Sequence, residues 1–380
     1  MFFSGQTKLK LPVQRFSVDY KIIGNNKEEA YAKAKDICVE QTAEFPEELV
    51  PQGVISDNIL GRIENFRNIN DNTFVARISY AVDSAAGELT QLLNVIFGNI
   101  SIKPGIRVEN INITPELAEK FKGPRFGTNG LRGILDVKDR PLLFTALKPM
   151  GVPAKELAEI AYKFAIGGID IIKDDHGLSN QPFCDFEERV KLCAAAVEKA
   201  NRETGNKSIY MPNITGPHSE IVSRAKKAKE LGAGGLLISP GLTGFDVIRE
   251  IADNDDINLP IMGHPAFLGS YVFGENGISH KALFGQIMRL AGADGTIYPN
   301  FGGRFSFTVQ ECESIVEGAT EYMEGLKPIF PCPAGGMTLE SIPQSLKVYG
   351  KNVVFLVGGG LFKHGDDLIE SSRYFRKIIE

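Results

Sequence analysis

The chain has 380 residues, more than one ordinary hydrophobic core supports unless the fold is a closed α/β barrel of about 250 residues. The composition is that of a folded globular protein, and the formal charge of -5 with a pI near 5.7 disfavours a nucleic-acid-binding surface. No apolar stretch reaches about 18 residues and no secretory-signal pattern opens the chain, so we expect no membrane span and a cytoplasmic protein. The five scattered cysteines are expected to be buried free thiols.

The first part of the chain predicts a small α+β domain of the ferredoxin-like kind. The patterns of strand, helix, strand, strand and helix follow one another at Phe16–Tyr20, Glu28–Cys38, Gly61–Ile63, Phe74–Tyr80 and Leu89–Phe97. Residues 122–127, Lys-Gly-Pro-Arg-Phe-Gly, are rich in breakers of regular structure. We therefore expect one domain over residues 1–122 and a second over residues 123–380.

Beyond residue 123, short apolar strands alternate with helical patterns. Eight strands are expected, at Leu143–Lys148, Ile169–Lys173, Ser208–Asn213, Gly235–Ser239, Pro260–His264, Gly295–Tyr298, Pro328–Pro331 and Val353–Val357. The helices expected between them include Ala154–Ala165, Phe186–Arg202, His218–Leu231, Ser279–Ala291 and Ser341–Tyr349. Eight parallel strands over about 240 residues predict a TIM (β/α)8 barrel, not an open doubly wound sheet.

Polar residues follow several of these strands, at the end where barrel enzymes carry their chemistry. Lys148 ends the first strand, and the run from Lys173 to His176 ends the second. Asn213 ends the third strand and His264 the fifth. Lysines and carboxylates that converge in one cavity are costly to bury unless they pair, bind metal or do chemistry. The pattern therefore favours an active site at this mouth.

Strands seven and eight run into glycines, at Ala334–Gly336 and Gly358–Gly360. Backbone N–H groups of glycine loops can approach an anion, and TIM barrels often bind phosphate after these two strands. We expect a phosphorylated ligand on Gly335, Gly336, Gly358 and Gly359. Plainer interpretations stay open, because a glycine run is often only a loop and a single histidine is often a core residue.

Several stretches carry a resemblance to one family. Gly167-Gly-Ile-Asp-Ile-Ile-Lys173-Asp-Asp175, followed by Asn180-Gln-Pro-Phe183, is similar to the metal-site signature of RuBisCO large subunits. Further stretches resemble the end of the family's N-terminal domain, its domain junction, its first catalytic lysine motif and its phosphate loops, at Val95–Asn99, Gly123–Gly127, Lys148-Pro149, Ala334–Gly336 and Gly358–Gly360. The resemblance covers nearly the whole chain, in order.

The resemblance implies a Mg²⁺ ion held by a carbamylated lysine and two carboxylates, in a homodimer or a higher multiple of dimers. In this sequence the carbamate falls on Lys173 and one metal carboxylate on Asp175, while His176 stands where the family has glutamate. Because Mg²⁺ prefers hard oxygen ligands, an imidazole at that position would weaken or alter the site. Lys148 aligns with the lysine that moves protons around the enolate.

Two residues of the first domain also match the family's active site. Asn99 aligns with a polar residue that the partner subunit contributes, and Glu40 with a glutamate that approaches the same site. The resemblance therefore implies an active site shared between two subunits.

Other positions depart from the family's carboxylases. Met150 replaces a second lysine, Pro265 an arginine that grips one phosphate, and Ile297 a histidine. The loop after strand six carries Arg304 where the carboxylases have a lysine, and a planar guanidinium does not replace a compact ammonium. Glu44-Phe45-Pro46 stands in place of a phosphate-binding Gly-Thr-Trp stretch. The chain thus resembles the RuBisCO-like proteins (form IV), and its substrate is expected to carry one phosphate.

The retained residues imply the family's first half-reaction without carbon dioxide fixation: a base removes the proton beside a carbonyl that Mg²⁺ polarises. Lys148 is the expected base and the carbamate of Lys173 its rival, while His264, Asn213 and Arg304 would orient the sugar or close a lid. RuBisCO-like proteins use such chemistry as 2,3-diketo-5-methylthiopentyl-1-phosphate enolases, sugar-phosphate isomerases and decarboxylases of 3-oxo sugar-acid phosphates. A non-catalytic sugar-phosphate-binding protein and, least favoured, a true carboxylase remain alternatives.

Overall fold

The computed structural model describes residues 13–305 and 307–380, and the chain divides into two compact units. Unit 1 comprises Met1–Lys122, Gly269–Gln286 and Tyr322–Leu326, and unit 2 comprises Gly123–Leu268, Ile287–Glu321 and Lys327–Glu380. Two short segments from the second half of the chain therefore belong to unit 1.

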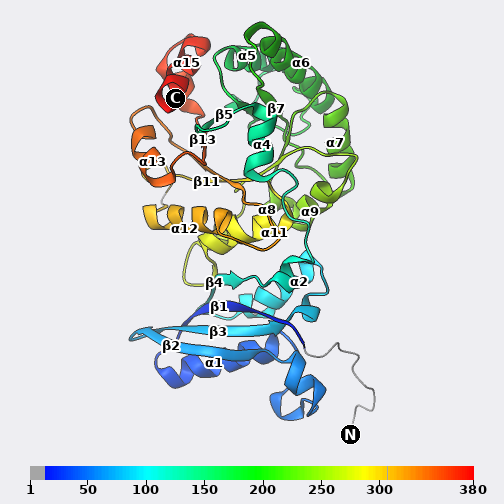
Figure 1. The fold of residues 1–380 in the computed structure, drawn as a ribbon, viewed down its shortest axis with the longest axis vertical. Coiled ribbons are helices and arrows are strands. Elements are labelled where there is room, and N and C mark those ends of the chain that lie inside the picture. Colours follow the sequence, from blue (N-terminus) through cyan, green and yellow to red (C-terminus); the bar gives the residue numbers. More distant parts are fainter. Residues whose placement is uncertain (1–12, 306) are drawn as a thin grey trace. The chain divides into compact units, whose positions relative to one another are not determined.

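Unit 1 is built on a five-stranded sheet with the order β10-β4-β1-β3-β2 (Figure 1). The strands are β1 Arg15–Ile23, β2 Arg62–Asn70, β3 Thr73–Ala81, β4 Ile106–Asn112 and β10 Gly277–Ile278. The helices are α1 Lys27–Glu40, α2 Leu89–Phe97, α3 Pro115–Ala118 and α10 Gly269–Val272, with short turns η1 Glu47–Leu49, η2 Ile55–Ile59, η3 Val82–Ala85 and η4 Asn99–Ile102. Up to β4, the main elements follow the order β-α-β-β-α-β.

Strict alternation in the sequence of β1 explains how this sheet packs. Phe16, Val18, Tyr20 and Ile22 are buried, and the residues between them are only half-buried. Successive strand residues point to opposite faces, so one face of β1 forms a core and the other stays accessible. Helix α1 packs on β1, β2 and β3 and buries its small residues there.

Unit 2 contains the eight expected strands, with bounds that differ from the expected ones by at most three residues. They are β5 Leu142–Leu147, β6 Ile171–Asp174, β7 Ile209–Met211, β8 Leu236–Ile238, β9 Ile261–Gly263, β11 Gly295–Pro299, β12 Phe330–Ala334 and β13 Val354–Leu356. The helices are α4 Gly127–Leu135, α5 Ala154–Ile166, α6 Phe186–Thr204, α7 His218–Glu230, α8 Pro240–Thr243, α9 Asp246–Asp253, α11 Met288–Ala291, α12 Val309–Thr320, α13 Ile342–Tyr349, α14 Gly359–His364 and α15 Leu368–Ile379.

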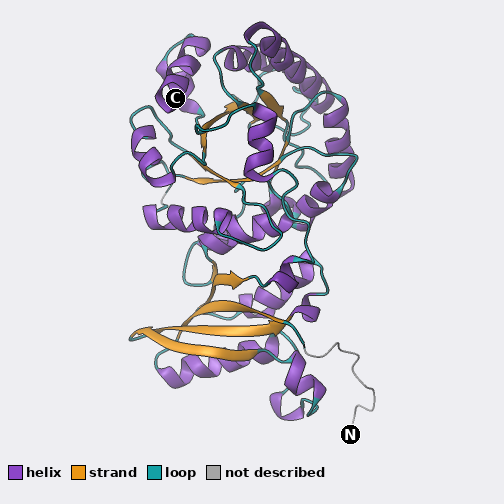
Figure 2. Cartoon of the chain, viewed as in Figure 1, coloured by secondary structure: helices purple, strands orange, loops and turns teal. Residues whose placement is uncertain are grey.

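The eight strands of unit 2 form two four-stranded parallel sheets, ordered β13-β5-β6-β7 and β12-β11-β9-β8. A bridge between Asn213 and Leu237 connects the β7 end of one sheet to the β8 end of the other. One hydrophobic cluster takes side chains from all eight strands and from α4, which lies in front of the strands in this view, while the longer helices lie around them (Figure 2). Because both faces are covered, strands such as β5 are buried at every residue and read as apolar runs.

Three local expectations can be compared with the structure. The helix expected over Ser279–Ala291 is instead a π-helix, η5 Lys281–Ile287, followed by the short α11. All five cysteines are buried free thiols, which confirms that expectation. Among the described residues, none of the helices has the length and apolar character needed to cross a membrane.

Candidate active site

The register of two neighbouring strands brings Lys148 and Asp175 together. Strands β5 and β6 are parallel, and Leu147 of β5 pairs with Asp174 of β6. The residues that follow them, Lys148 and Asp175, therefore leave the two strands at the same level. Accordingly, Nζ of Lys148 lies 2.8 Å from Oδ1 of Asp175. This ion pair lies at the carboxyl ends of the strands, where α/β barrels carry their chemistry.

Strand alternation places Lys173 on the inner side of β6. Ile171 belongs to the core cluster of unit 2, and Lys173 stands two residues further along the same face. Lys173 is only 2% exposed, and its Nζ donates a hydrogen bond of 2.9 Å to the backbone oxygen of Asp174. Burial lowers the pKa of Lys173 to about 8 against the opposing attraction of Asp175, and the positive charge of Lys148 lowers it further. A substantial share of this amine is therefore neutral near physiological pH.

Asp175 remains an anion. Burial would raise the pKa of its carboxyl, but hydrogen bonds from His176 and Lys148 and the charges of the two lysines hold that pKa well below its ordinary value. Nδ1 of His176 lies 3.5 Å from Oδ1 of Asp175. The site thus offers a carboxylate oxygen flanked by two lysine side chains and an imidazole.

The two site histidines stack on each other. The ring centroids of His176 and His264 are 4.5 Å apart, with an angle of 14° between their planes. Nδ1 of His264 accepts a hydrogen bond of 3.1 Å from the backbone N–H of Ala266. Burial lowers the pKa of His264 well below its ordinary value, and the positive charge of Lys173 adds to the effect. His264 is therefore a neutral imidazole beside the buried lysine.

The expected metal ligands Lys173, Asp175 and His176 come from one short segment at the end of β6. Across the described residues, no group of three histidine, cysteine, aspartate or glutamate side chains is placed to hold a metal ion. Asp175 supplies the hard oxygen that Mg²⁺ prefers. Lys173 would supply a second oxygen ligand only as a carbamate, so these residues suit Mg²⁺ once that lysine is carbamylated.

The loop after β13 lies beside the ion pair. A Cβ atom added at Gly358 would lie 3.8 Å from Cε of Lys148, and one added at Gly359 would meet nothing within 4 Å. A Cβ at Gly360 would come within 2.7 Å of the backbone oxygen of Met337, which follows β12. Of the two expected phosphate glycines after β13, Gly358 therefore borders Lys148 and Gly359 faces open space, while the next residue, Gly360, packs against the loop after β12.

The loop after β11 contacts the glycines that follow β12. Gly335 and Gly336 have φ angles of 81° and 113°, a region that glycine adopts far more readily than other residues. A Cβ at Gly336 would lie 3.0 Å from Cα of Gly303, and the N–H of Arg304 donates to the oxygen of Gly335 over 3.2 Å. The side chain of Arg304 is exposed, with its guanidinium carbon 5.0 Å from the centroid of the Phe305 ring.

Asn213 holds the loop after β6 through its side-chain amide. Its Nδ2 donates to the backbone oxygens of His176 and Leu178, over 3.0 and 2.8 Å. Its Oδ1 accepts from the N–H of Thr215 over 3.2 Å. All the hydrogen-bonding atoms of this amide serve the protein itself.

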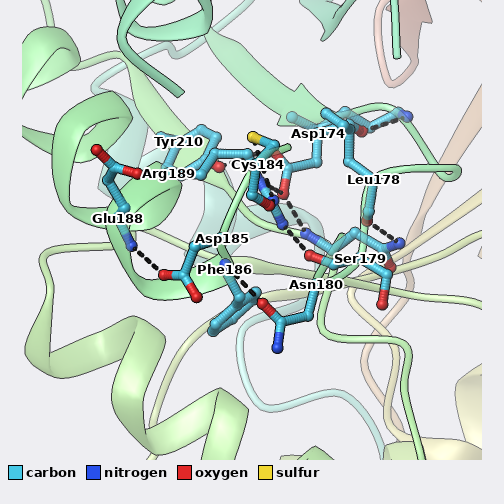
Figure 3. A network of polar contacts seen from close by, with 12 residues as sticks. Asp174, Leu178, Ser179, Asn180, Cys184, Asp185, Phe186, Glu188, Arg189 and Tyr210 are labelled. Carbon is cyan, nitrogen blue, oxygen red and sulfur yellow. Dashed lines mark hydrogen bonds and ion pairs between the residues drawn. The ribbon is translucent and has the colours of Figure 1, made fainter. Parts of the chain in front are cut away.

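Asp174, Arg189 and Tyr210 form a polar network that sequence reasoning did not single out (Figure 3). Asp174 is fully buried, and its carboxylate accepts from Nε of Arg189 over 3.1 Å and from the hydroxyl of Tyr210 over 2.6 Å. The backbone N–H of Asn213 donates to the same carboxylate over 3.0 Å. The alternation of β6 was the available signal, because it sends Asp174 to the opposite face from Lys173.

Asn99 lies in unit 1, where it begins η4, two residues after the end of α2. Its Nδ2 donates to Oε1 of Glu40 over 3.0 Å and to Oε1 of Glu44 over 2.9 Å. Lys103 approaches the other oxygen of Glu40 at 3.3 Å. Asn99 and Glu40, which were expected to serve one active site, are therefore hydrogen-bonded to each other.

Two of the positions that depart from the carboxylases have contrasting environments. Met150 is 55% exposed, and its Cε would lie 3.3 Å from a Cβ added at Gly177 in the loop after β6. Ile297 is buried in the core cluster of unit 2. An apolar side chain thus lies at the rim of the site near the Lys148–Asp175 pair.

Parallel strands with lysine and carboxylate at their carboxyl ends define an α/β protein with a candidate active site at those ends. The model of the ribulose bisphosphate carboxylase large chain, catalytic domain, matches residues 127–377. A ribulose bisphosphate carboxylase-like protein of Rhodopseudomonas palustris is 34% identical over 95% of this chain and 96% of its own length. The chain therefore belongs to the RuBisCO large-chain family, as a RuBisCO-like protein.

Two relatives with named activities have a comparable sequence identity to this chain. A 5-methylthioribulose-1-phosphate isomerase of Rhodospirillum rubrum is 35% identical over 90% of this chain and 91% of its own length. A 2,3-diketo-5-methylthiopentyl-1-phosphate enolase of Geobacillus thermodenitrificans is 33% identical over 80% of this chain and 75% of its own length.

Solved structures show the same fold. A RuBisCO-like protein from Alicyclobacillus acidocaldarius matches with a TM-score of 0.88 and 30% identity, over 96% of this chain and 93% of its own. A dimeric archaeal RuBisCO from Hyperthermus butylicus matches with a TM-score of 0.85 and 27% identity, over 97% of this chain and 91% of its own.

Proposed function

We propose that this protein is an enolase- or isomerase-type enzyme that enolises a phosphorylated keto-sugar-like substrate with Mg²⁺ and does not fix carbon dioxide. The observation that carries the proposal is the Lys148–Asp175 pair of 2.8 Å beside the buried Lys173, whose pKa is lowered to about 8. The names of the isomerase and enolase relatives support the same class of reaction.

In this proposal the residues divide the work by their chemistry. Nζ of Lys148 takes or returns the proton on the carbon beside the substrate's carbonyl, and the carbamate of Lys173 is the rival base. Gly335 and Gly336, together with Gly358 and Gly359, present backbone N–H groups to the phosphate. His264 orients a substrate hydroxyl, and Arg304 lies on the loop that would close over the site.

Lys173 as a carbamate, Asp175 and His176 would hold the metal. Bound there, Mg²⁺ would polarise the carbonyl oxygen and lower the cost of forming the enolate. The neutral share of the Lys173 amine supports carbamylation, because carbon dioxide adds to an unprotonated amine. The carboxylate of Asp175 remains charged, as a metal ligand must.

We further propose a homodimer, or a multiple of dimers, in which Asn99 completes the site of the partner subunit. The relative described as a dimeric RuBisCO supports this assembly. Residues 1–122 are taken as a ferredoxin-like domain, supported by the β-α-β-β-α-β order. Residues 123–380 are taken as a closed TIM barrel, supported by the core shared among all eight strands.

The test is deuterium exchange followed by NMR on keto-sugar monophosphates, with Mg²⁺ and bicarbonate. Exchange beside the carbonyl is expected, and it should fall by about 10³-fold in Lys173→Ala. Lys155→Ala, which removes an exposed lysine of α5, is the matched control and should exchange like the unaltered protein. Tight binding of a sugar phosphate without exchange would instead favour a binding protein, and release of carbon dioxide from a 3-oxo acid phosphate would favour a decarboxylase.

A further inference from the structure

The guanidinium of Arg189, on α6, is fully buried behind β6, and each of its nitrogens has a partner. Nε donates to Asp174 over 3.1 Å, and Nη1 donates to the backbone oxygen of Cys184 over 3.0 Å. Nη2 donates to the backbone oxygen of Ser179 over 2.6 Å. Two of these three contacts fall on the loop between β6 and α6, so one side chain binds the strand end and the loop at once (Figure 3).

Asp174 connects this network to the active site through its backbone. Its carboxylate faces Arg189 and Tyr210, while its backbone oxygen accepts the hydrogen bond from Nζ of Lys173. The next residue is Asp175, whose carboxylate holds Lys148. The side chain of Asp174 is thus held by Arg189 and Tyr210, while its backbone lies between Lys173 and Asp175.

The loop after Asp175 is fixed by the same network. Asn213 donates its backbone N–H to Asp174 and its amide hydrogens to the oxygens of His176 and Leu178. Arg189 holds the same loop one residue later, at Ser179. The backbone oxygens of His176, Leu178 and Ser179 are thus held by Asn213 and Arg189.

A buried ion pair is a poor source of stability, because desolvation of both charges offsets most of their attraction. An apolar pair of similar volume would hold α6 against β6 at least as well, but it would leave the oxygens of Ser179 and Cys184 without these donors. Only the planar fork of arginine reaches a carboxylate and two carbonyls together. The network therefore suits a role in loop geometry better than a role in packing.

We propose that Arg189 is a positioning residue, which acts through Asp174 and the oxygens of Ser179 and Cys184 to fix Asp175 and His176 in the active site. The inference rests on the proposed enolising function and goes beyond it, because Arg189 lies behind the strand and touches no substrate. Small displacements of reacting groups are costly, since about 1 Å of misplacement can reduce turnover by about 10²-fold.

The experiment compares Arg189→Lys with Arg132→Lys. Arg132 is also buried, and its guanidinium donates to the backbone oxygens of Val137, Arg140 and Lys351, all of which precede strands β5 and β13. The Arg132→Lys substitution therefore removes a similar carbonyl-binding guanidinium, but at the opposite ends of the strands. For each variant we would measure kcat and KM by the exchange assay, and amide hydrogen exchange of residues 175–185 by mass spectrometry.

Arg189→Lys is expected to lower kcat by about ten- to hundredfold with KM changed less than about twofold, and to speed amide exchange in residues 175–185. Arg132→Lys should leave kcat and that loop unchanged. Tyr210→Phe, which removes one hydrogen bond to Asp174, should produce a smaller effect of the same kind and serves if Arg189→Lys does not fold. Equal effects of the two lysine variants on kcat would overturn the proposal, as would unchanged loop exchange in Arg189→Lys.

The two readouts separate this proposal from the proposed function. If the unaltered protein enolises none of the substrates, the enolase assignment fails, while the loop exchange still tests the positioning role. If the protein enolises a substrate but Arg189→Lys retains full kcat, only the positioning role fails.

Discussion

Two adjacent carboxylates at the end of strand β6, Asp174 and Asp175, have different environments. On the inner face, Asp175 contacts Lys148 and lies close to His176, and its side chain keeps 18% of its exposure. On the outer face, Asp174 is fully enclosed and accepts from Arg189, Tyr210 and Asn213. The inner carboxylate has capacity left for a ligand, whereas the outer one is saturated by the protein.

This contrast shows how one short strand can serve chemistry and architecture together. Alternation sends Lys173 and Asp175 inward and Asp174 outward, so neighbouring residues have separate partners. Two of the outer partners, Arg189 and Asn213, also hold backbone oxygens of the loop that follows Asp175. Identical side-chain chemistry therefore does not imply an identical role.

Replacement of each aspartate by asparagine tests this contrast most strongly. Asp175→Asn should lower turnover by about 10²- to 10⁴-fold, because this side chain is both the expected metal ligand and the partner of Lys148, and the substitution removes its charge. Loss of the partly exposed Lys148–Asp175 ion pair should lower the free energy of unfolding by about 1 kcal/mol or less. Asp174→Asn should cost about 3–5 kcal/mol, because Arg189 stays buried without a counter-charge. Urea unfolding measures the loss of stability of each variant, and the exchange assay measures its turnover. Equal losses of stability in the two variants would contradict the contrast.

The imidazole beside the inner carboxylate can be exchanged for the family's acidic ligand. His176→Glu should strengthen Mg²⁺ binding about tenfold, since a carboxylate oxygen suits Mg²⁺ better than a nitrogen. Titration calorimetry with Mg²⁺ and bicarbonate measures the change. His176→Gln is the neutral control, and an equal gain in that variant would exclude the charge as the cause.

The lowered pKa of Lys173 predicts how carbamylation depends on pH. The amine reacts in its neutral form, and with a pKa of about 8 that form increases about fivefold between pH 7 and pH 8. The rate of carbamate formation at constant dissolved carbon dioxide should rise accordingly and level off above pH 8. Carbon-13 NMR with labelled bicarbonate follows it, with Lys173→Ala as the blank. A midpoint near the ordinary lysine value would show that burial does not act on this amine.

The smallest expected effect concerns the loop after β12. Gly336→Ala and Gly350→Ala both place a side chain at a positive φ, which costs about 1 kcal/mol in the free energy of unfolding. Only at Gly336 would the new Cβ press on a neighbour, the Cα of Gly303 at 3.0 Å, and Gly350 has open space. Inorganic phosphate should therefore bind about fivefold more weakly to Gly336→Ala alone, as calorimetry would measure. Equal binding by both variants would argue against a phosphate site in this loop.

The sequence predicted the strands of unit 2 better than the full sheet of unit 1. Buried parallel strands are short apolar runs between glycines and helices, so all eight could be located. Strand β4 was missed, since its alternation of apolar and polar residues breaks at Glu109 and Asn110, where its pairing with β1 also shifts register. Its role as a strand depends on its pairing with β1, across a large separation in the chain.

By itself, the sequence determined the order of the unit 2 strands along the chain and the residues that follow their ends. Hydrophobic periodicity and residues that break regular structure are local features of the sequence. The sequence also marked Lys148, Lys173 and Asp175 by their positions at those ends. Only the tertiary structure decided which groups meet: Lys148 with Asp175, His176 with His264, and Arg189 with the loop behind the site. Those contacts depend on strand register and on the side to which each residue points, and both are set when distant segments pair.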